Sequence, residues 1–166
     1  MARISFKGHP TRTAGSLPAV GSKAPDFELT GTDLAQYTLG HWSGRRKLLN
    51  IFPSIDTPVC AASARKFNAE AAGRENTVIL NVSADLPFAQ KRYCASEGLD
   101  DVSNLSTFRA PEFGLNYGVR IEDGPLRGLC ARAIVVIDEN DTVVHTQLVP
   151  EIADEPDYEA ALKTLG

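Results

Sequence analysis

Cys60 stands where a cysteine becomes reactive, at the predicted start of a helix. Thr57 is a favourable N-cap residue, Pro58 suits the first helical position, and residues 61–68 mostly continue a helix. Cys60 is then the third helical residue, where its sulfur faces backbone N–H groups and the positive end of the helix dipole. Because this position favours the nucleophilic thiolate, we interpret Cys60 as a reactive thiol rather than as an inert buried cysteine.

The turn that carries Cys60 follows a short apolar segment, residues 48–52, which has the length of a buried strand. Pro53 ends this strand because proline has no N–H group to donate to a neighbouring strand. We therefore expect a central strand to be followed by a turn, and this turn to place the Cys60 thiol at the start of the helix.

Composition excludes several classes of function. The chain has 166 residues and a formal net charge of −4, which suits one domain over residues 1–166 and gives no basic excess for binding nucleic acid or an anionic membrane surface. It contains no run of 18 apolar residues and no signal-peptide pattern at its start. We therefore expect a cytoplasmic protein.

The sequence offers no cofactor or metal motif. Three cysteines, Cys60, Cys94 and Cys130, are an odd number without a Cys-x-x-Cys pair, which argues against a disulfide scaffold and a structural zinc site. The acidic segment 138–141 lacks the glycine and glutamate of a calcium loop, so we interpret it as a turn. The histidines share no spacing with Cys60 that is typical of a catalytic dyad. We expect neither a cofactor nor a metal.

Strands and helices alternate along the middle of the chain, and a hairpin and a helix follow. This order predicts an α/β protein of thioredoxin-like fold, with a mixed central sheet flanked by helices and an N-terminal β-hairpin. The expected elements are a hairpin within 2–13, strands at 27–30, 35–39, 48–52, 77–82 and 102–107, helices from 57 to near 73, from 83 to 98 and over 110–117, a hairpin of 131–137 and 142–149, and a helix from 154 to 165.

Two polar patterns are interpreted without a function. The basic residues 45–47 are predicted to be a solvated strand entry. Asn-x-Ser/Thr triplets begin at Asn81, Asn104 and Asn140 and resemble glycosylation acceptors, but no secretory signal accompanies them.

The segment 53–60 matches the Pro-x-x-x-Thr-x-x-Cys signature of the peroxiredoxins. Residues 50–57, 83–90 and 138–141 resemble the bacterial thiol peroxidase branch in particular, and the similarity covers essentially the whole chain. This resemblance implies a thioredoxin-fold enzyme that reduces hydrogen peroxide and organic hydroperoxides without a metal or prosthetic group, and that commonly forms a homodimer.

The same resemblance assigns roles to five residues. Cys60 is implied to be the peroxidatic cysteine and Cys94 the resolving cysteine. Thr57 and Pro53 are implied to shape the pocket, and Arg132 to be the arginine that a distant strand contributes. In the implied cycle, the Cys60 sulfenic acid forms an intramolecular disulfide with Cys94, and thioredoxin reduces that disulfide.

Physical chemistry supports these roles independently. Cleavage of an O–O bond needs a thiolate together with donors aimed at the oxygens, because negative charge moves onto the leaving alkoxide. A hydroxyl at Thr57 and the permanent charge of Arg132 could supply such donors. Lys91 and Arg92 precede Cys94 and favour its thiolate. Because the two thiols lie on separate predicted helices, we expect local unfolding before they can meet.

Alternatives remain open at this stage. Cys130 is either a small buried apolar residue or a second resolving thiol, and on an alternating strand it would share the face of Arg132. The whole protein could instead be a peroxide-responsive sensor or adaptor that uses the same disulfide switch. A third alternative is a non-catalytic interaction module, for which Cys60→Ser would change nothing.

Overall fold

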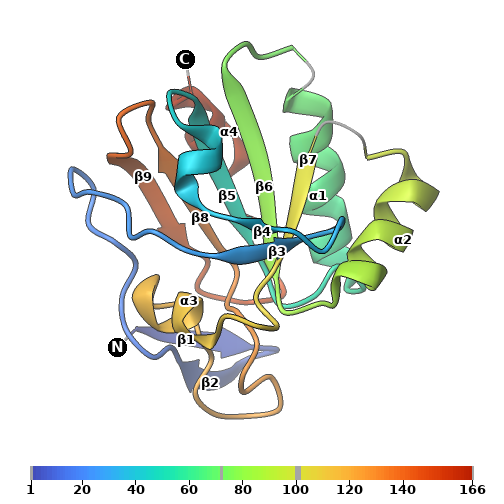
Figure 1. Cartoon of the computed structure of the whole chain (residues 1–166). Helices are drawn as coiled ribbons and strands as arrows, with labels where there is room; N and C mark the ends of the chain where they lie inside the picture. Colours follow the sequence, from blue (N-terminus) through green and yellow to red (C-terminus); the bar gives the residue numbers. More distant parts are fainter. Residues whose placement is uncertain (1, 72, 100–101, 166) are drawn as a thin grey trace.

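The computed structural model describes residues 2–71, 73–99 and 102–165. Within them, a seven-stranded sheet has the order β4-β3-β7-β6-β5-β8-β9, and β1 and β2 form a separate antiparallel hairpin (Figure 1). The strands β5, β6 and β7 are parallel to one another, whereas β8 is antiparallel to β5. The predicted mixed sheet and N-terminal hairpin are therefore confirmed.

The elements follow the predicted order, with ends that differ by a few residues. The strands are β1 (Arg3–Phe6), β2 (His9–Arg12), β3 (Leu29–Gly31), β4 (Gln36–Tyr37), β5 (Arg46–Ile51), β6 (Thr77–Ser83), β7 (Val102–Ser106), β8 (Ala133–Ile137) and β9 (Val143–Leu148). The helices are η1 (Leu39–Trp42), α1 (Pro58–Ala71), α2 (Pro87–Glu97), α3 (Pro111–Asn116) and α4 (Tyr158–Lys163). The short 3₁₀ helix η1 was not predicted.

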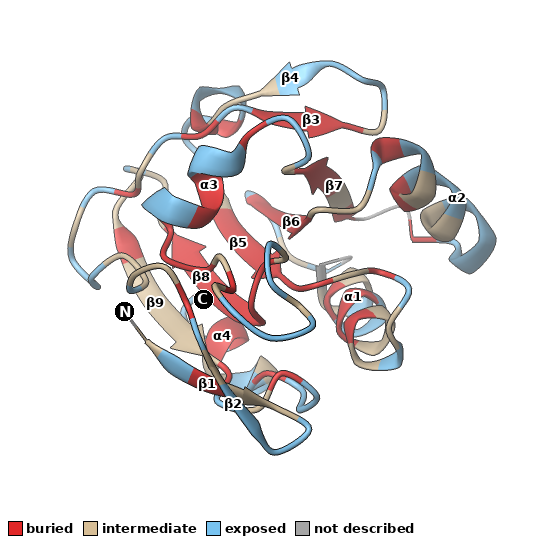
Figure 2. Ribbon diagram, turned by 90° about the horizontal axis from the view of Figure 1, so that it is seen from below, coloured by how far each residue is buried: buried red, intermediate tan, exposed pale blue. Residues whose placement is uncertain are grey.

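Apolar side chains cover both faces of the sheet, and they do so by strict alternation along β8. Ala133, Val135 and Ile137 belong to one hydrophobic cluster, together with residues of η1 and α3. Ile134 and Val136 belong to a second cluster, with residues of α1 and α4. The strands β6 and β8 are consequently buried along their whole length (Figure 2).

The basic entry to β5 is solvated as predicted at Arg45 and in part at Arg46, but the prediction is wrong for Lys47. Lys47 is fully buried and its Nζ lies 2.6 Å from a carboxylate oxygen of Asp141, while Arg46 Nε lies 3.0 Å from Glu139. The cause is topological: β8 runs antiparallel beside β5, so the acidic turn after β8 reaches the start of β5. The predicted turn at 138–141 is confirmed, and its acids neutralise the strand entry.

Candidate active site

The turn after β5 builds the helix start that the sequence predicts. Helix α1 begins at Pro58, and the backbone N–H of Cys60 donates to Thr57 Oγ1 at 3.3 Å. The Thr57 hydroxyl donates in turn to the carbonyl of Ser54 at 3.1 Å. Thr57 is therefore the N-cap, and Cys60 occupies the third helical position with no exposed surface. Pro53 is buried where the chain leaves β5.

Arg132 reaches the Cys60 thiol from 72 residues further along the chain, immediately before β8. Its Nη2 donates to Cys60 Sγ at 3.2 Å, and its Nε donates to the carbonyl of Ile152 at 2.8 Å. The Arg132 residue is only 2% exposed. Among the described residues, its Nη1 is buried without a hydrogen-bond partner. A permanent cation thus touches the sulfur and keeps a further donor available beside it.

The N-terminal hairpin anchors residues 150–152, and the Ile152 carbonyl in this segment accepts a hydrogen bond from Arg132. The backbone N–H of Ser5 in β1 donates to Pro150 at 2.7 Å, and the N–H of Ile152 donates back to Ser5 at 2.8 Å. The carbonyl of Ile152 is then fixed in place to accept from the guanidinium. The hairpin therefore helps to orient the arginine.

Asp85 braces the turn before Cys60, and the sequence analysis missed this function. Its carboxylate accepts from the N–H of Ile55 and from the hydroxyls of Ser54 and Ser83, each at 2.7 Å. The signal that could have found it is topological, because loops at the carboxyl ends of adjacent parallel strands meet at one edge of the sheet. An acid directly after β6 can therefore reach the loop after β5.

Cys94 lies on α2 and is half-buried. Its sulfur accepts a hydrogen bond from Asn104 Nδ2 of β7 at 2.8 Å, whereas the Cys60 sulfur accepts from Arg132 beside β8. In the sheet, β7 and β8 are separated by β6 and β5, a separation of three strand spacings or about 14 Å. Each sulfur has its own partner and no disulfide joins the two thiols, although both pack against one hydrophobic cluster.

Cys130 does not share a face with Arg132, so that prediction is wrong. Cys130 packs in the cluster that contains Ala133 and Val135, on the opposite side of the sheet from Cys60. Alternation fails because β8 begins only at Ala133, and Cys130 forms an isolated bridge with Arg120 instead. Burial raises the pKa of the Cys130 thiol to about 12. This environment supports the interpretation of Cys130 as an inert buried residue.

The sequence profile described as Redoxin matches residues 19–162. The chain belongs to the redoxin family. This redoxin is 56% identical over 166 residues to proteins named thiol peroxidase from Mycobacterium tuberculosis H37Rv and from Mycobacterium bovis, covering all of this chain and 99% of each relative. The relationship confirms the prediction of a thiol-dependent peroxidase.

Solved structures agree with the fold of this redoxin. A peroxiredoxin-like protein from Aquifex aeolicus is 38% identical, with a TM-score of 0.94 over 99% of this chain and 96% of that chain. A thiol peroxidase from Chromobacterium violaceum shares the fold, with a TM-score of 0.91 at 24% identity over 98% and 94% of the two chains. The thioredoxin-like architecture is thereby confirmed.

The described part of the redoxin has neither a metal-binding cluster nor a membrane-spanning helix. Residues 2–71, 73–99 and 102–165 contain no cluster of three or more histidine, cysteine or acidic side chains placed to bind a metal ion. In the same ranges, none of the helices has the length and apolar character needed to cross a membrane.

Proposed function

We propose that Cys60 is the peroxidatic cysteine and that Arg132 is its catalytic partner. The observation that carries this proposal is the 3.2 Å contact between Arg132 Nη2 and the Cys60 sulfur, in a site where Arg132 Nη1 is buried with no hydrogen-bond partner in the described part of the chain. A buried guanidinium with a spare donor suits a polar substrate that arrives next to the sulfur.

In the proposed reaction, the Cys60 thiolate attacks the terminal oxygen of the hydroperoxide. A sulfur–oxygen bond forms, the O–O bond breaks, and its electron pair leaves with the alkoxide, which takes up a proton to give the alcohol or water. Arg132 Nη2 holds the thiolate, and Nη1 donates to the peroxide as the negative charge moves to the leaving oxygen. Thr57 and Pro53 fix the turn and exclude water. No step needs a metal or a prosthetic group.

Cys94 is proposed to resolve the sulfenic acid. Its thiolate attacks the Cys60 sulfur, a disulfide forms, and hydroxide leaves. A disulfide needs Cα atoms within about 7 Å, so the first turn of α1 and part of α2 must loosen. Amide hydrogen exchange of the oxidised and reduced forms tests this step. Unchanged protection over residues 57–64 would contradict it.

Thioredoxin is the proposed reductant, and the cytoplasm is the proposed compartment. Sustained consumption of NADPH through thioredoxin reductase and thioredoxin, dependent on peroxide and lost in Cys60→Ser, would support the enzyme. A single stoichiometric oxidation would indicate a sensor instead. Comparing hydrogen peroxide with cumene hydroperoxide on the wild type and on Cys94→Ser identifies the preferred substrate class and the resolving step.

A homodimer of single-domain chains, each domain spanning residues 1–166, is also proposed. Large apolar side chains are exposed shortly after β6 and β7: Leu86, in the loop before α2, is 53% exposed, Phe88, in the first turn of α2, is 68% exposed, and Phe108, after β7, is 43% exposed. Such side chains commonly mark a protein interface. Phe88→Ser is expected to shift the protein towards monomer in analytical ultracentrifugation, whereas Val20→Ser, at a residue that is 61% exposed on a different loop, is not.

A further inference from the structure

Three asparagines stand in register across the centre of the sheet. Asn50 of β5 pairs with Asn81 of β6, and Asn81 pairs with Asn104 of β7. Because these strands are parallel, the three side chains lie on one face, the face that carries Cys60 and is covered by α1 and α2. Asn50 and Asn81 have no exposed surface, and Asn104 is 7% exposed. We call these three residues the asparagine row.

Hydrogen bonds along the asparagine row all run in one direction. Asn50 Nδ2 donates to Asn81 Oδ1 at 3.0 Å, and Asn81 Nδ2 donates to Asn104 Oδ1 at 3.4 Å. Asn104 Nδ2 then donates to the sulfur of Cys94 at 2.8 Å. Bonds that are aligned in this way polarise one another, so the last amide is a better donor than an isolated one.

The opposite end of the asparagine row reaches the helix of Cys60. Asn50 Nδ2 also contacts Ser63 Oγ at 3.4 Å, and the Ser63 hydroxyl donates to the carbonyl of Cys60 at 2.9 Å. Three polar side chains in an apolar layer cost free energy, since each must find partners that an apolar residue would not need. A functional role at one end of the row would explain why this cost is tolerated. The last donor of the row, Asn104, bonds to the Cys94 thiol.

We propose that Asn104 is a positioning residue that stabilises Cys94 as a thiolate through the asparagine row. The inference rests on the proposed function of Cys94. An N–H donor favours an anionic acceptor over a neutral one, so the bond from Asn104 increases the fraction of Cys94 present as thiolate. This thiolate is the species that attacks the sulfenic acid and expels hydroxide.

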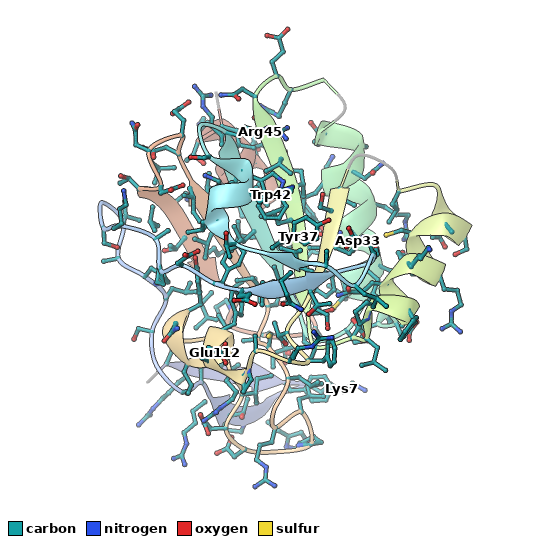
Figure 3. All side chains as sticks on the ribbon, viewed as in Figure 1. Lys7, Asp33, Tyr37, Trp42, Arg45 and Glu112 are labelled. Atoms are coloured by element: carbon teal, nitrogen blue, oxygen red, sulfur yellow. The ribbon has the colours of Figure 1, made fainter. Side chains whose placement is uncertain are left out.

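Charged groups from several elements also surround Cys94. Lys91 and Arg92 belong to α2 itself. Asp33, Tyr37 and His41 line the same pocket as Cys94 and Asn104. Figure 3 shows Asp33 and Tyr37 beside strands β3 and β4.

From α1, Arg65 donates to the hydroxyl of Tyr93, the neighbour of Cys94. The Tyr37 hydroxyl donates a hydrogen bond to the Asp33 carboxylate, and this bond weakens the effect of the Asp33 charge on Cys94. All of these groups are retained in the variants used below, so differences between those variants report on the row.

The test uses protein in which Cys60 and Cys130 are replaced by serine, so that Cys94 is the sole thiol. The rate of alkylation by iodoacetamide is measured against pH. In Asn104→Leu, the midpoint of this profile is expected to rise by about one pH unit, a tenfold loss of thiolate at neutral pH. Asn104→Ala gives the same readout should the leucine variant fail to fold.

Asn81→Leu is the matched control. It buries the same side chain one strand further away and also breaks the row, but it leaves the donor on the Cys94 sulfur. Its midpoint is expected to move by less than half as much as that of Asn104→Leu. Equal shifts in the two variants, or no shift in either, would overturn the proposal, because a purely structural effect of losing one asparagine would be common to both.

A second measurement follows the resolving step in the otherwise natural chain. After a pulse of hydrogen peroxide, Asn104→Leu is expected to form the Cys60–Cys94 disulfide about threefold more slowly at pH 7. The rate falls less than the thiolate fraction because a more basic thiolate attacks faster. If the wild type forms no such disulfide, the proposed function fails, whereas the alkylation profile still tests the effect of Asn104 on Cys94.

Discussion

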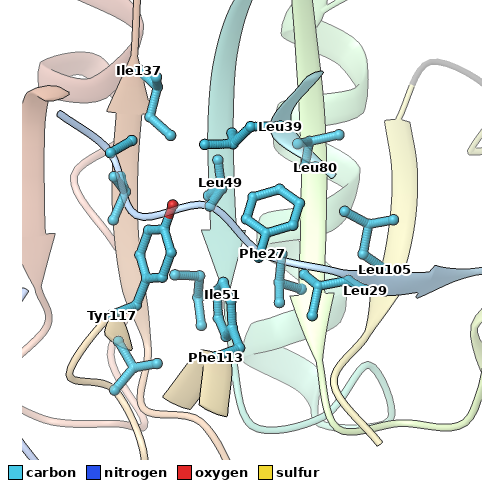
Figure 4. Packing of buried hydrophobic residues seen from close by; sticks show 14 of the residues in the cluster. Phe27, Leu29, Leu39, Leu49, Ile51, Leu80, Leu105, Phe113, Tyr117 and Ile137 are labelled. Atoms are coloured by element: carbon cyan, nitrogen blue, oxygen red, sulfur yellow. The ribbon is translucent and has the colours of Figure 1, made fainter. Parts of the chain in front are cut away.

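The two faces of the central sheet are covered by similar apolar residues, but they differ in the polar side chains that enter the apolar layer. On the face of Cys130, aromatic rings pack against one another: Phe113 and Tyr117 are stacked with centroids 4.6 Å apart, and Phe27 packs beside them (Figure 4). On the face of Cys60, an arginine and a row of asparagines enter the layer.

Each face buries one cysteine almost completely, so burial alone does not decide reactivity. Cys130 is 4% exposed and Cys60 is 0% exposed. Burial raises the pKa of Cys130 to about 12 and keeps it a thiol. The guanidinium of Arg132 instead contacts the Cys60 sulfur directly, at 3.2 Å. The partner of each thiol, rather than its depth, distinguishes the two sites.

The largest expected difference between the faces is catalytic. Cys60→Ser is expected to lower peroxide reduction by at least about a thousandfold, because the nucleophile is lost. Cys130→Ser should retain the wild-type rate. Peroxide-dependent oxidation of NADPH in the coupled thioredoxin assay measures both. Comparable losses in the two variants would show that the faces are not functionally distinct.

Phe113→Ala is expected to act on stability instead. Phe113 is 1% exposed within the apolar face, and truncation of such a ring costs about 3–5 kcal/mol of unfolding free energy. Urea denaturation measures this loss. The value of kcat/KM per folded molecule should stay near that of the wild type, and a large drop would mean that the apolar face also shapes the active site.

Arg132→Met tests the cation on the face of Cys60. It is expected to lower kcat/KM for hydrogen peroxide about a hundredfold, by removing donors to the sulfur and to the leaving oxygen. Arg120→Met is the control, because Arg120 bridges to Cys130 and its guanidinium pairs with Glu122 at 2.8 Å. The Arg120→Met variant should keep the wild-type kcat/KM. An equal loss in both variants would show that Arg132 has no specific role in the reaction.

The smallest expected effect concerns pH and Cys130. The thiol loses its proton near pH 8.5 in the unfolded chain, whereas its pKa is about 12 in the folded protein. Above pH 9 the unfolded state therefore binds fewer protons, and stability falls as the pH rises. Compared with Cys130→Ala, the wild type should lose about 1.2 kcal/mol more between pH 9 and 10.

Urea denaturation under reducing conditions measures this difference. Parallel stability curves for the wild type and Cys130→Ala would show that Cys130 titrates in the folded protein as it does in the unfolded chain.

Local patterns carried most of the sequence prediction. The N-cap at Thr57, the proline after it and the cysteine two residues later define the helix start, because capping depends on adjacent residues. Arg132 was assigned only by family resemblance, since no local pattern says which loop lies above which helix. The structure adds the geometry that a resemblance cannot provide, including an Arg132 Nη1 that is buried without a hydrogen-bond partner among the described residues.

Relations across strands could not be predicted in the same way. Asn81 and Asn104 attracted notice only as parts of glycosylation-like triplets, whereas the register of parallel strands places them side by side in a buried row. Lys47 appeared solvated because its partner, Asp141, lies 94 residues away. The side of the sheet that Cys130 faces depended on a short irregular segment before β8, which breaks the alternation that a sequence pattern assumes.

The N-terminal hairpin contributes to the position of Arg132 although it lies outside the family match. The family match starts at residue 19, so β1 and β2 lie outside the part of the chain that defines a redoxin. Through Ser5 and Ile152, however, the hairpin anchors the backbone carbonyl that orients Arg132. A chain cut back to the family boundary would retain every strand of the central sheet and both thiols of the proposed cycle, yet the carbonyl that accepts from Arg132 would lose its anchor on the hairpin.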